Sequence, residues 1–389
     1  MSLPNTAILD SCPPGERAAL EDDFRAIAQA SAKGLSASRA NSSNNSWLIW
    51  ESFCHALAQD PTLVDLADPI PLLRLFSHRY RSGALAPSGT CVRSRTVEGA
   101  VRAVGQTVAT LGSPDPRLQP SGKLYLRLQR LLKAYAKEDD PPTRVKPIPL
   151  PVIAHAVTVC HLQQSSRSLV IADMLILGFF FLLRPGEYAA TSNPVSTPFR
   201  LPYVRLYRNQ LRLDYMTAPL QHLHTATAVA LEFTNQKNGV RGELVGLRRS
   251  GHPTLCPVVA VVNRLIHLHL HRAPPTTFLY QHYDGVKWEA IDASALTATL
   301  RQAANATGGP YGIVPSDISA RSLRSSGAMA LLCAAVDTDV IRLLGRWRSD
   351  EMMRYLHVQA LPILAPLATQ MVTHGAFALL PNPPIPPLP

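Results

Sequence analysis

Residues 344–358 read Leu-Gly-Arg-Trp-Arg-Ser-Asp-Glu-Met-Met-Arg-Tyr-Leu-His-Val and combine three arginines with a single tyrosine, Tyr355. Taken alone, a tyrosine in such a stretch is usually a core or interface residue. A phenol can also act as a nucleophile that forms a covalent ester with its substrate. The elements that precede this stretch favour the second interpretation.

Three upstream elements carry further candidate functional residues. A very apolar predicted helix is followed by Arg184-Pro-Gly-Glu187, and Lys237 lies in a predicted turn after a strand. The segment Ser319-Ala-Arg321-Ser-Leu-Arg324 opens another predicted helix with two arginines one turn apart. Such a helix start suits a phosphate. Each element alone also has an ordinary explanation, such as a helix-end ion pair or a solvated lysine.

Together, the order and spacing of these elements resemble the tyrosine recombinase (phage integrase) superfamily. Its first box, an apolar helix ending in Leu-Arg-x-x-Glu, is matched by residues 183–187, and its His-x-Leu-Arg box is matched by residues 321–324. Its last box, Leu-Gly-His/Trp followed by a tyrosine and often by x-His-Val, is matched by residues 344–358. The Gly-Arg-Trp variant is similar to recombinases of eukaryotic mobile elements, Crypton-like ones especially.

The resemblance implies a role for each residue in cutting and rejoining DNA strands. Tyr355 would attack a phosphodiester and stay attached as a phosphotyrosyl ester, which preserves the bond energy for rejoining. Arg184 and Arg324 would clamp the two non-bridging oxygens, and Lys237 would protonate the leaving 5′ oxygen. Glu187 would orient Arg184. Arginines replace cations in this chemistry, so we expect no cofactor and no metal.

Two positions depart from the family pattern. Arg321 stands where the family usually has histidine, and arginine cannot accept a proton near neutral pH, although it can contact the phosphate. At the His/Trp position, counting back from the tyrosine gives Arg346, whereas chemical similarity favours Trp347. The general base has no assigned residue, and His357 is an open alternative. A degenerate, inactive copy is the rival interpretation.

The composition of the chain favours a polyanionic partner. Its 389 residues carry 38 Lys and Arg against 27 Asp and Glu, a formal charge of +11, and 46% are hydrophobic. The apolar content excludes a fully disordered chain, and the charge favours nucleic acid or an anionic membrane surface. No segment resembles a membrane span or a signal peptide, and the six cysteines are spread singly. We expect an intracellular protein, nuclear if its source is eukaryotic.

Proline-rich stretches predict the domain boundaries, because each proline fixes φ and removes an amide donor. We expect a flexible N-terminus over 1–30, a helical core-binding domain over 31–140, a proline-rich linker over 141–151, a catalytic domain over 152–375 and a proline-rich tail over 376–389.

Hydrophobic periodicity predicts the secondary structure. In the first domain it indicates helices over 44–59, 93–112 and 121–136, the second with Thr96 as its N-cap. In the second it indicates helices over 148–163, 168–183, 256–272, 292–306, 321–335, 337–345 and 348–357. Alternation predicts strands over 203–215 and 226–234, with a turn at 236–239. The predicted fold class is mainly α with a small antiparallel sheet (α+β).

The sequence therefore favours a site-specific DNA recombinase or integrase of a mobile element, acting on double-stranded DNA through a 3′-phosphotyrosyl intermediate. The resemblance further implies a homo-oligomer, a tetramer on DNA, and no membrane. Type IB topoisomerases share the chemistry without strand exchange. The alternative function is that of a catalytically inactive DNA-binding protein on the same scaffold. The joint presence of Arg184, Lys237, Arg324 and Tyr355 argues against that alternative.

Overall fold

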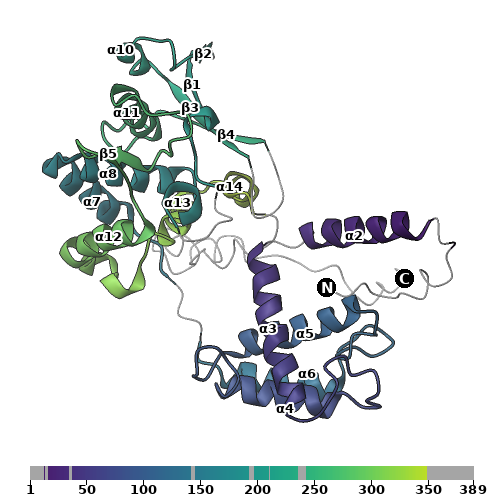
Figure 1. The fold of residues 1–389 in the computed structure, drawn as a ribbon. Coiled ribbons are helices and arrows are strands. Elements are labelled where there is room, and N and C mark those ends of the chain that lie inside the picture. Colours follow the sequence, from purple (N-terminus) through teal and green to yellow (C-terminus); the bar gives the residue numbers. More distant parts are fainter. Residues whose placement is uncertain are drawn as a thin grey trace, which may run out of the picture. The chain divides into compact units, whose positions relative to one another are not determined.

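The computed structural model describes residues 13, 16–34, 37–141, 145–191, 197–209, 211–234 and 242–347. The chain divides into two compact units, Met1–Pro142 and Thr143–Pro389, whose elements Figure 1 labels. Each unit has its own hydrophobic core. Within the described ranges, no helix has both the length and the apolar character needed to cross a membrane.

The N-terminal unit consists of helices. They are α2 (Arg17–Lys33), α3 (Ala37–His55), α4 (Ile70–Arg81), α5 (Ser94–Thr110) and α6 (Leu126–Glu138). Helix α2 lies in the stretch that was expected to be flexible. Ion pairs one turn apart, from Arg17 and Arg25 to Glu21, support it. Helix α4 was not predicted.

An aromatic cluster forms the centre of the N-terminal unit. Trp50 of α3 is fully buried and meets the ring of Phe76 of α4 edge-on at 5.1 Å between centroids. Its indole N–H donates to the carbonyl of Pro61 at 2.9 Å, which satisfies the one polar group of the side chain. The helix predicted over 44–59 ends earlier, at His55, and Leu57 beyond it is exposed.

Asp139, directly after α6, links the end of that helix to α4 and to the start of α5. Its carboxylate accepts hydrogen bonds from the backbone N–H of Ser94 at 2.8 Å, from the Ser94 hydroxyl at 2.5 Å and from the Arg81 guanidinium. These donors hold the pKa of the carboxyl down at about 2. Asp139 thus satisfies the start of α5 from a distance. The prediction of Thr96 as N-cap was wrong, because the cap residue is Arg93.

Helix α8 forms the centre of the C-terminal unit. The helices of this unit are α7 (Leu150–Gln163), α8 (Ser166–Phe180), α9 (Pro185–Tyr188), α10 (Leu220–Leu223), α11 (Pro257–Leu270), α12 (Ala293–Thr307), α13 (Ser322–Cys333) and α14 (Thr338–Gly345). Every residue from Val170 to Phe179 is buried, and α8 packs against α7, α11, α12 and α13 (Figure 1). Helix α7 begins inside the predicted linker, since a proline is tolerated in the first turn.

A small antiparallel sheet completes the C-terminal unit. Its strands are β1 (Val204–Arg208), β2 (Leu211–Leu213), β3 (Ala228–Phe233) and β4 (Glu243–Arg248), in the order β2-β1-β3-β4. A separate hairpin pairs β5 (Gln281–Tyr283) with β6 (Trp288–Ala290). The single strand predicted over 203–215 was wrong, because the backbone of Asn209 takes a left-handed φ of 49° and splits it into β1 and β2. The predicted α+β class is confirmed.

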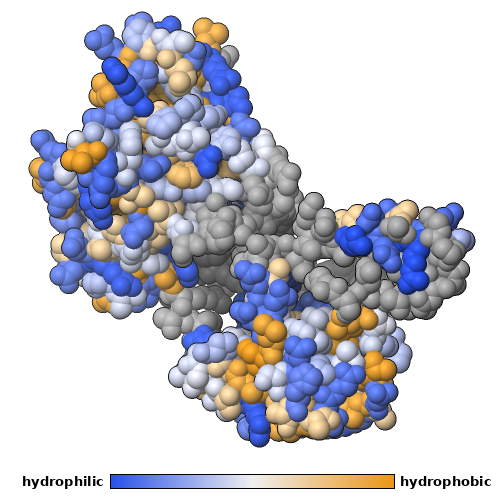
Figure 2. Space-filling model, in the orientation of Figure 1, coloured by the Kyte–Doolittle hydropathy of each residue, from blue (hydrophilic) through white to orange (hydrophobic). Residues whose placement is uncertain are grey.

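Apolar side chains on the described surface lie in small groups among hydrophilic residues (Figure 2). Such scattered exposure is normal for a folded protein. The helix predicted over 348–357, the turn at 236–239 and the tail over 376–389 lie outside the described residues.

Candidate active site

The segment after α8 brings Arg184 to the surface of the C-terminal unit. Helix α8 ends at Phe180, and Leu182 then takes a left-handed φ of 50°, which ends the helical path before Arg184. Glu187 reaches back across α9 and accepts from the Arg184 backbone N–H at 2.8 Å and from Arg184 Nη1 at 3.1 Å. The Arg184 side chain stays 32% exposed, so a ligand can reach its guanidinium.

Arg324, in the first turn of α13, is buried beside the same segment. Its Nη1 donates to the carbonyl of Leu182 at 2.7 Å, and its Nη2 donates to the carbonyl of Gly345. Close packing of α13 on the end of α8 makes this possible. A side chain at Gly327 would overlap the carbonyl oxygen of Phe179, so a glycine is required there.

The end of α14 covers Arg324. The indole ring of Trp347 lies 4.2 Å from the Arg324 guanidinium carbon, an arrangement in which the ring face attracts the cation. Gly345 permits this fold of the chain, because a Cβ there would overlap the Trp347 ring. Trp347 therefore packs on one of the two predicted clamp arginines.

Arg346 points into the interior, and its side chain is 0% exposed. Its Nη1 donates to the carbonyls of Phe181 and Leu344, both at 3.1 Å. Its Nη2 donates to the carbonyl of Leu182 at 3.3 Å and to Glu187 Oε2 at 3.2 Å. The guanidinium carbon also lies 3.8 Å from the centre of the Phe233 ring, at the end of β3.

We call Arg184, Arg324, Arg346 and Glu187 the arginine cluster. Arg184 and Arg346 both donate to Glu187, and Arg324 shares the carbonyl of Leu182 with Arg346. Burial lowers the pKa of Arg346, whereas the charges of Glu187 and Glu243 raise it and that of Arg184 lowers it. An arginine stays protonated near neutral pH. The guanidinium groups thus outnumber the carboxylates, which favours binding of an anion at the exposed Arg184.

Arg321 takes no part in the arginine cluster. It is the N-cap residue of α13, its side chain is exposed, and it forms no ion pair within the part of the chain that the structure describes. Its backbone N–H donates to the Ser319 hydroxyl at 3.3 Å. The structure therefore brings together Arg184, Glu187, Arg324, Arg346 and Trp347, and leaves Arg321 at the surface.

The predicted nucleophile and general acid lie outside the described residues. Tyr355 and the alternative base His357 follow Trp347, the last described residue. Lys237 lies between β3 and β4, which pair in antiparallel fashion from Phe233↔Glu243 to Ala228↔Arg248. Phe233 and Trp347, whose rings contact Arg346 and Arg324, thus lie close along the chain to the segments that hold Lys237 and Tyr355.

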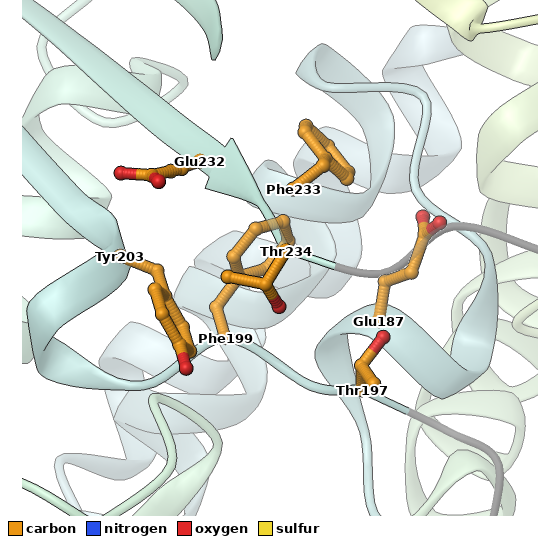
Figure 3. Close-up of a pocket in the computed structure, with 7 residues that line it drawn as sticks. All are labelled: Glu187, Thr197, Phe199, Tyr203, Glu232, Phe233 and Thr234. Carbon is orange, nitrogen blue, oxygen red and sulfur yellow. The ribbon is translucent and has the colours of Figure 1, made fainter. Parts of the chain in front are cut away.

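A small hollow lies beside the arginine cluster (Figure 3). It is lined by Glu187, Thr197, Phe199, Tyr203, Glu232, Phe233 and Thr234 and holds about 10 Å³. That volume is about enough for one water molecule. This hollow is therefore too small to admit a small-molecule substrate.

Sequence reasoning missed the main-chain groups that orient the arginines. The carbonyl of Leu182 accepts from both Arg324 and Arg346, and the carbonyl of Gly345 accepts from Arg324. It also missed Phe233 as the ring beneath Arg346. Gly345 belongs to a motif in the sequence, but no local pattern indicates which distant side chain donates to its carbonyl.

Comparison with known proteins gives similarities to solved structures only, since no family model and no curated protein matches the chain. The Tn1549 transposon integrase in complex with transposon right end DNA has 9% identity and a TM-score of 0.45, over 80% of this chain and 87% of that chain. The XerH site-specific recombinase bound to difH substrate has 12% identity and a TM-score of 0.44, over 80% and 71%. The XerA recombinase has 12% identity and a TM-score of 0.36, over 91% and 97%.

Proposed function

We propose that the chain is a tyrosine recombinase that cleaves and rejoins DNA strands, with site-specific recombination of a mobile element as its function. One observation carries the proposal. Arg184, Arg324 and Arg346, each from a different box of the sequence, meet in one cluster around the carbonyl of Leu182 and the carboxylate of Glu187. A cluster with excess positive charge at a surface suits the phosphate of a polymer.

The proposed reaction exchanges one phosphate ester for another. Tyr355 gives its phenol proton to solvent water, and its oxygen forms a bond to the scissile phosphorus while the bond from phosphorus to the 5′ oxygen breaks, which leaves a 3′-phosphotyrosyl ester. Arg184 and Arg324 offset the charge that develops on the non-bridging oxygens. Lys237 gives its proton to the departing 5′ oxygen. Attack of a 5′ hydroxyl on the ester reverses these changes and rejoins the strand.

Exposed basic side chains support duplex DNA as the partner. In the C-terminal unit they follow the four-stranded sheet and include Arg208, Arg212, Arg248 and Arg249. In the N-terminal unit they lie on α4 and α6 and include Arg74, Arg79, Arg127, Arg130, Lys133 and Lys137. Within this proposal the enzyme acts as a homo-oligomer, a tetramer on DNA, and works in the nucleus if its source is eukaryotic.

One observation favours the alternative function, an inactive DNA-binding protein. Both terminal nitrogens of Arg324 donate to main-chain carbonyls, and Arg321 replaces the histidine expected in an active enzyme. A guanidinium held in this way stabilises the fold whether or not DNA is cut. The two functions differ in one measurable product, the covalent adduct.

Trapping with a nicked duplex tests the proposed function. When the fragment beyond the scissile phosphate is short, it diffuses away after cleavage and the covalent adduct accumulates. We expect the native protein to form an adduct that survives denaturation. We expect Tyr355→Phe to form none, with DNA affinity within a few-fold of native, because only the phenol oxygen is lost. Absence of the native adduct, with DNA binding intact, would establish the inactive DNA-binding protein instead.

A further inference from the structure

We propose that Arg346 is a positioning residue that holds Glu187 and thereby fixes Arg184 toward the scissile phosphate. This inference rests on the proposed function and adds to it. It concerns a residue that counting back from Tyr355 places where the resembling family carries histidine or tryptophan. The contacts of Arg346 differ from those of a residue that reaches the substrate, because its side chain is 0% exposed.

The contacts of Glu187 show how Arg346 acts on Arg184. Oε1 of Glu187 accepts from Arg184 Nη1, and Oε2 accepts from the Arg184 backbone N–H and from Arg346 Nη2. Arg346 therefore holds the carboxylate oxygen to which the Arg184 guanidinium does not donate. Without it, the Glu187 side chain would lose its ion pair with an arginine from a distant part of the chain.

The sharing of one carboxylate also preserves positive charge on Arg184. A carboxylate paired with a single arginine offsets most of the charge of that arginine locally. Glu187 divides its two oxygens between two guanidinium groups, so Arg184 keeps more of its attraction for a phosphate. Arg346 thus orients Glu187 and limits how far Glu187 neutralises the positive charge of Arg184.

Three fixed groups keep Arg346 itself in place. Its Nη1 donates to the carbonyls of Phe181 and Leu344, and its guanidinium lies against the ring of Phe233. A planar, delocalised guanidinium can stack on a ring and donate to several acceptors at once, which a lysine ammonium cannot do. The position therefore demands arginine rather than any positive charge.

The test compares Arg346→Met with Arg342→Met in the full-length protein. Arg342 lies on α14, in the turn before Arg346, but its side chain is 43% exposed and pairs with Asp339. Single-turnover cleavage of the nicked duplex is measured at saturating DNA, together with DNA affinity and melting temperature. We expect Arg346→Met to cleave about 10- to 100-fold more slowly, with affinity within a few-fold of native, because displacement of a positioned group costs about this much. Arg342→Met should match native in both.

A double variant tests whether the effect passes through Glu187. If it does, Arg346→Met combined with Glu187→Gln should cleave no more slowly than the slower single variant. A duplex with sulfur in place of the bridging 5′ oxygen tests whether Arg346 acts instead through protonation of the leaving group. Sulfur leaves without a proton donor, so the Arg346→Met defect should persist on it. Multiplicative effects of the two substitutions, or restoration of cleavage by sulfur, would overturn the inference.

Loss of folding is distinguished from loss of positioning by Arg346→Lys. It retains the charge and part of the contact with Glu187, so we expect intermediate cleavage at a near-native melting temperature. Native-rate cleavage by a folded Arg346→Met, or a loss in Arg346→Lys that follows only its melting temperature, would show a purely structural role. A native protein that forms no adduct would reject the proposed function. In that case, non-additive changes in melting temperature for the Arg346 and Glu187 variants would support the contact between the two residues, and additive changes would overturn it.

Discussion

Arg324 and Arg346 donate to the same main-chain oxygen, that of Leu182, at distances of 2.7 and 3.3 Å. Two like charges that share one neutral acceptor repel each other, so other groups must hold them there. The carbonyl of Gly345 and the ring of Trp347 hold Arg324, and Glu187 holds Arg346. The left-handed Leu182 thus joins the first box of the sequence to the two later ones.

The two arginines of the second box should respond differently to replacement by histidine. We expect Arg324→His to reduce cleavage about 10²- to 10³-fold, because it removes one preorganised donor to a developing oxyanion. It should also lower the free energy of unfolding by about 1–3 kcal/mol, since the carbonyl of Gly345 loses the Arg324 hydrogen bond and the carbonyl of Leu182 keeps only that from Arg346. Arg321→His, at an exposed position, should keep much of the cleavage and the native stability.

Single-turnover cleavage and denaturant unfolding of both variants test this prediction. Equal loss of cleavage in both would show that the second box is misaligned. If Arg321→His instead cleaves faster than native, the natural protein is a weakened enzyme that has lost its base.

A methyl group added at Gly327 should disturb the arginine cluster. The Cβ of Gly327→Ala would overlap the Phe179 carbonyl and the Leu182 side chain, so α13 must move away from α8. Overpacking of this kind costs about 1–3 kcal/mol of stability, and the shift should slow cleavage as well. Gly309→Ala is the matched control, because a Cβ there has open space within 4 Å. Equal melting temperatures for the two variants would contradict the packing described here.

The contact between His267 of α11 and the hairpin β5–β6 should make the protein less stable in acid. His267 accepts a hydrogen bond at Nε2 from the Tyr283 backbone N–H at 3.0 Å, which requires the neutral ring. Burial, with the charges of Arg264, His271 and His282, lowers the pKa of His267 to about 4. The unfolded chain takes up the proton near pH 6.5. Folding is therefore unaffected above pH 6.5 and increasingly opposed as the pH falls to about 4.

The expected loss from His267 is roughly 1–3 kcal/mol over that interval. We would measure denaturant unfolding of the native protein and of His267→Gln at several pH values. The difference between their free energies of unfolding gives the contribution of His267. Glutamine can accept the Tyr283 hydrogen bond without titrating. Parallel stability curves for the two proteins would show that His267 carries no linkage.

Cleavage should not depend on a divalent cation, since arginines take the place of metal ions at the phosphate. We expect adduct formation to persist in excess chelator. DNA affinity should fall with salt at a log–log slope of about −0.9 for each phosphate neutralised. Loss of cleavage on chelation with recovery in magnesium would identify a metal-dependent nuclease instead.

The sequence predicted the long helices of the C-terminal unit because their apolar residues recur with helical spacing and their caps are local. Helix α8 begins after Ser165 and α12 after Asp292, and both cap side chains accept from a backbone N–H three residues on. The start of α5 was misplaced because its capping group is Asp139, which is distant in sequence. Strands β5 and β6 escaped prediction because three residues are too few to show alternation.

The motifs indicated four residues that lie close together in the structure, but not the contacts among them. Arg184, Glu187, Arg324 and Trp347 stand in motifs with fixed spacing, so residue type and spacing together indicated them. The burial of Arg346 against Glu187 depends on a chain path of 159 residues between them, which no local pattern records. The contact with Glu187 gives Arg346 a role of its own, distinct from that of Trp347.

Asp139 determines where the N-terminal unit can be cut from the rest of the protein. A fragment that stops at Glu138 would leave the Arg81 guanidinium and the Ser94 donors without their common acceptor. A fragment that keeps Asp139 and ends at Pro141 retains all three bonds and still omits the second unit. Separate study of the two halves of this protein therefore depends on the inclusion of a single carboxylate.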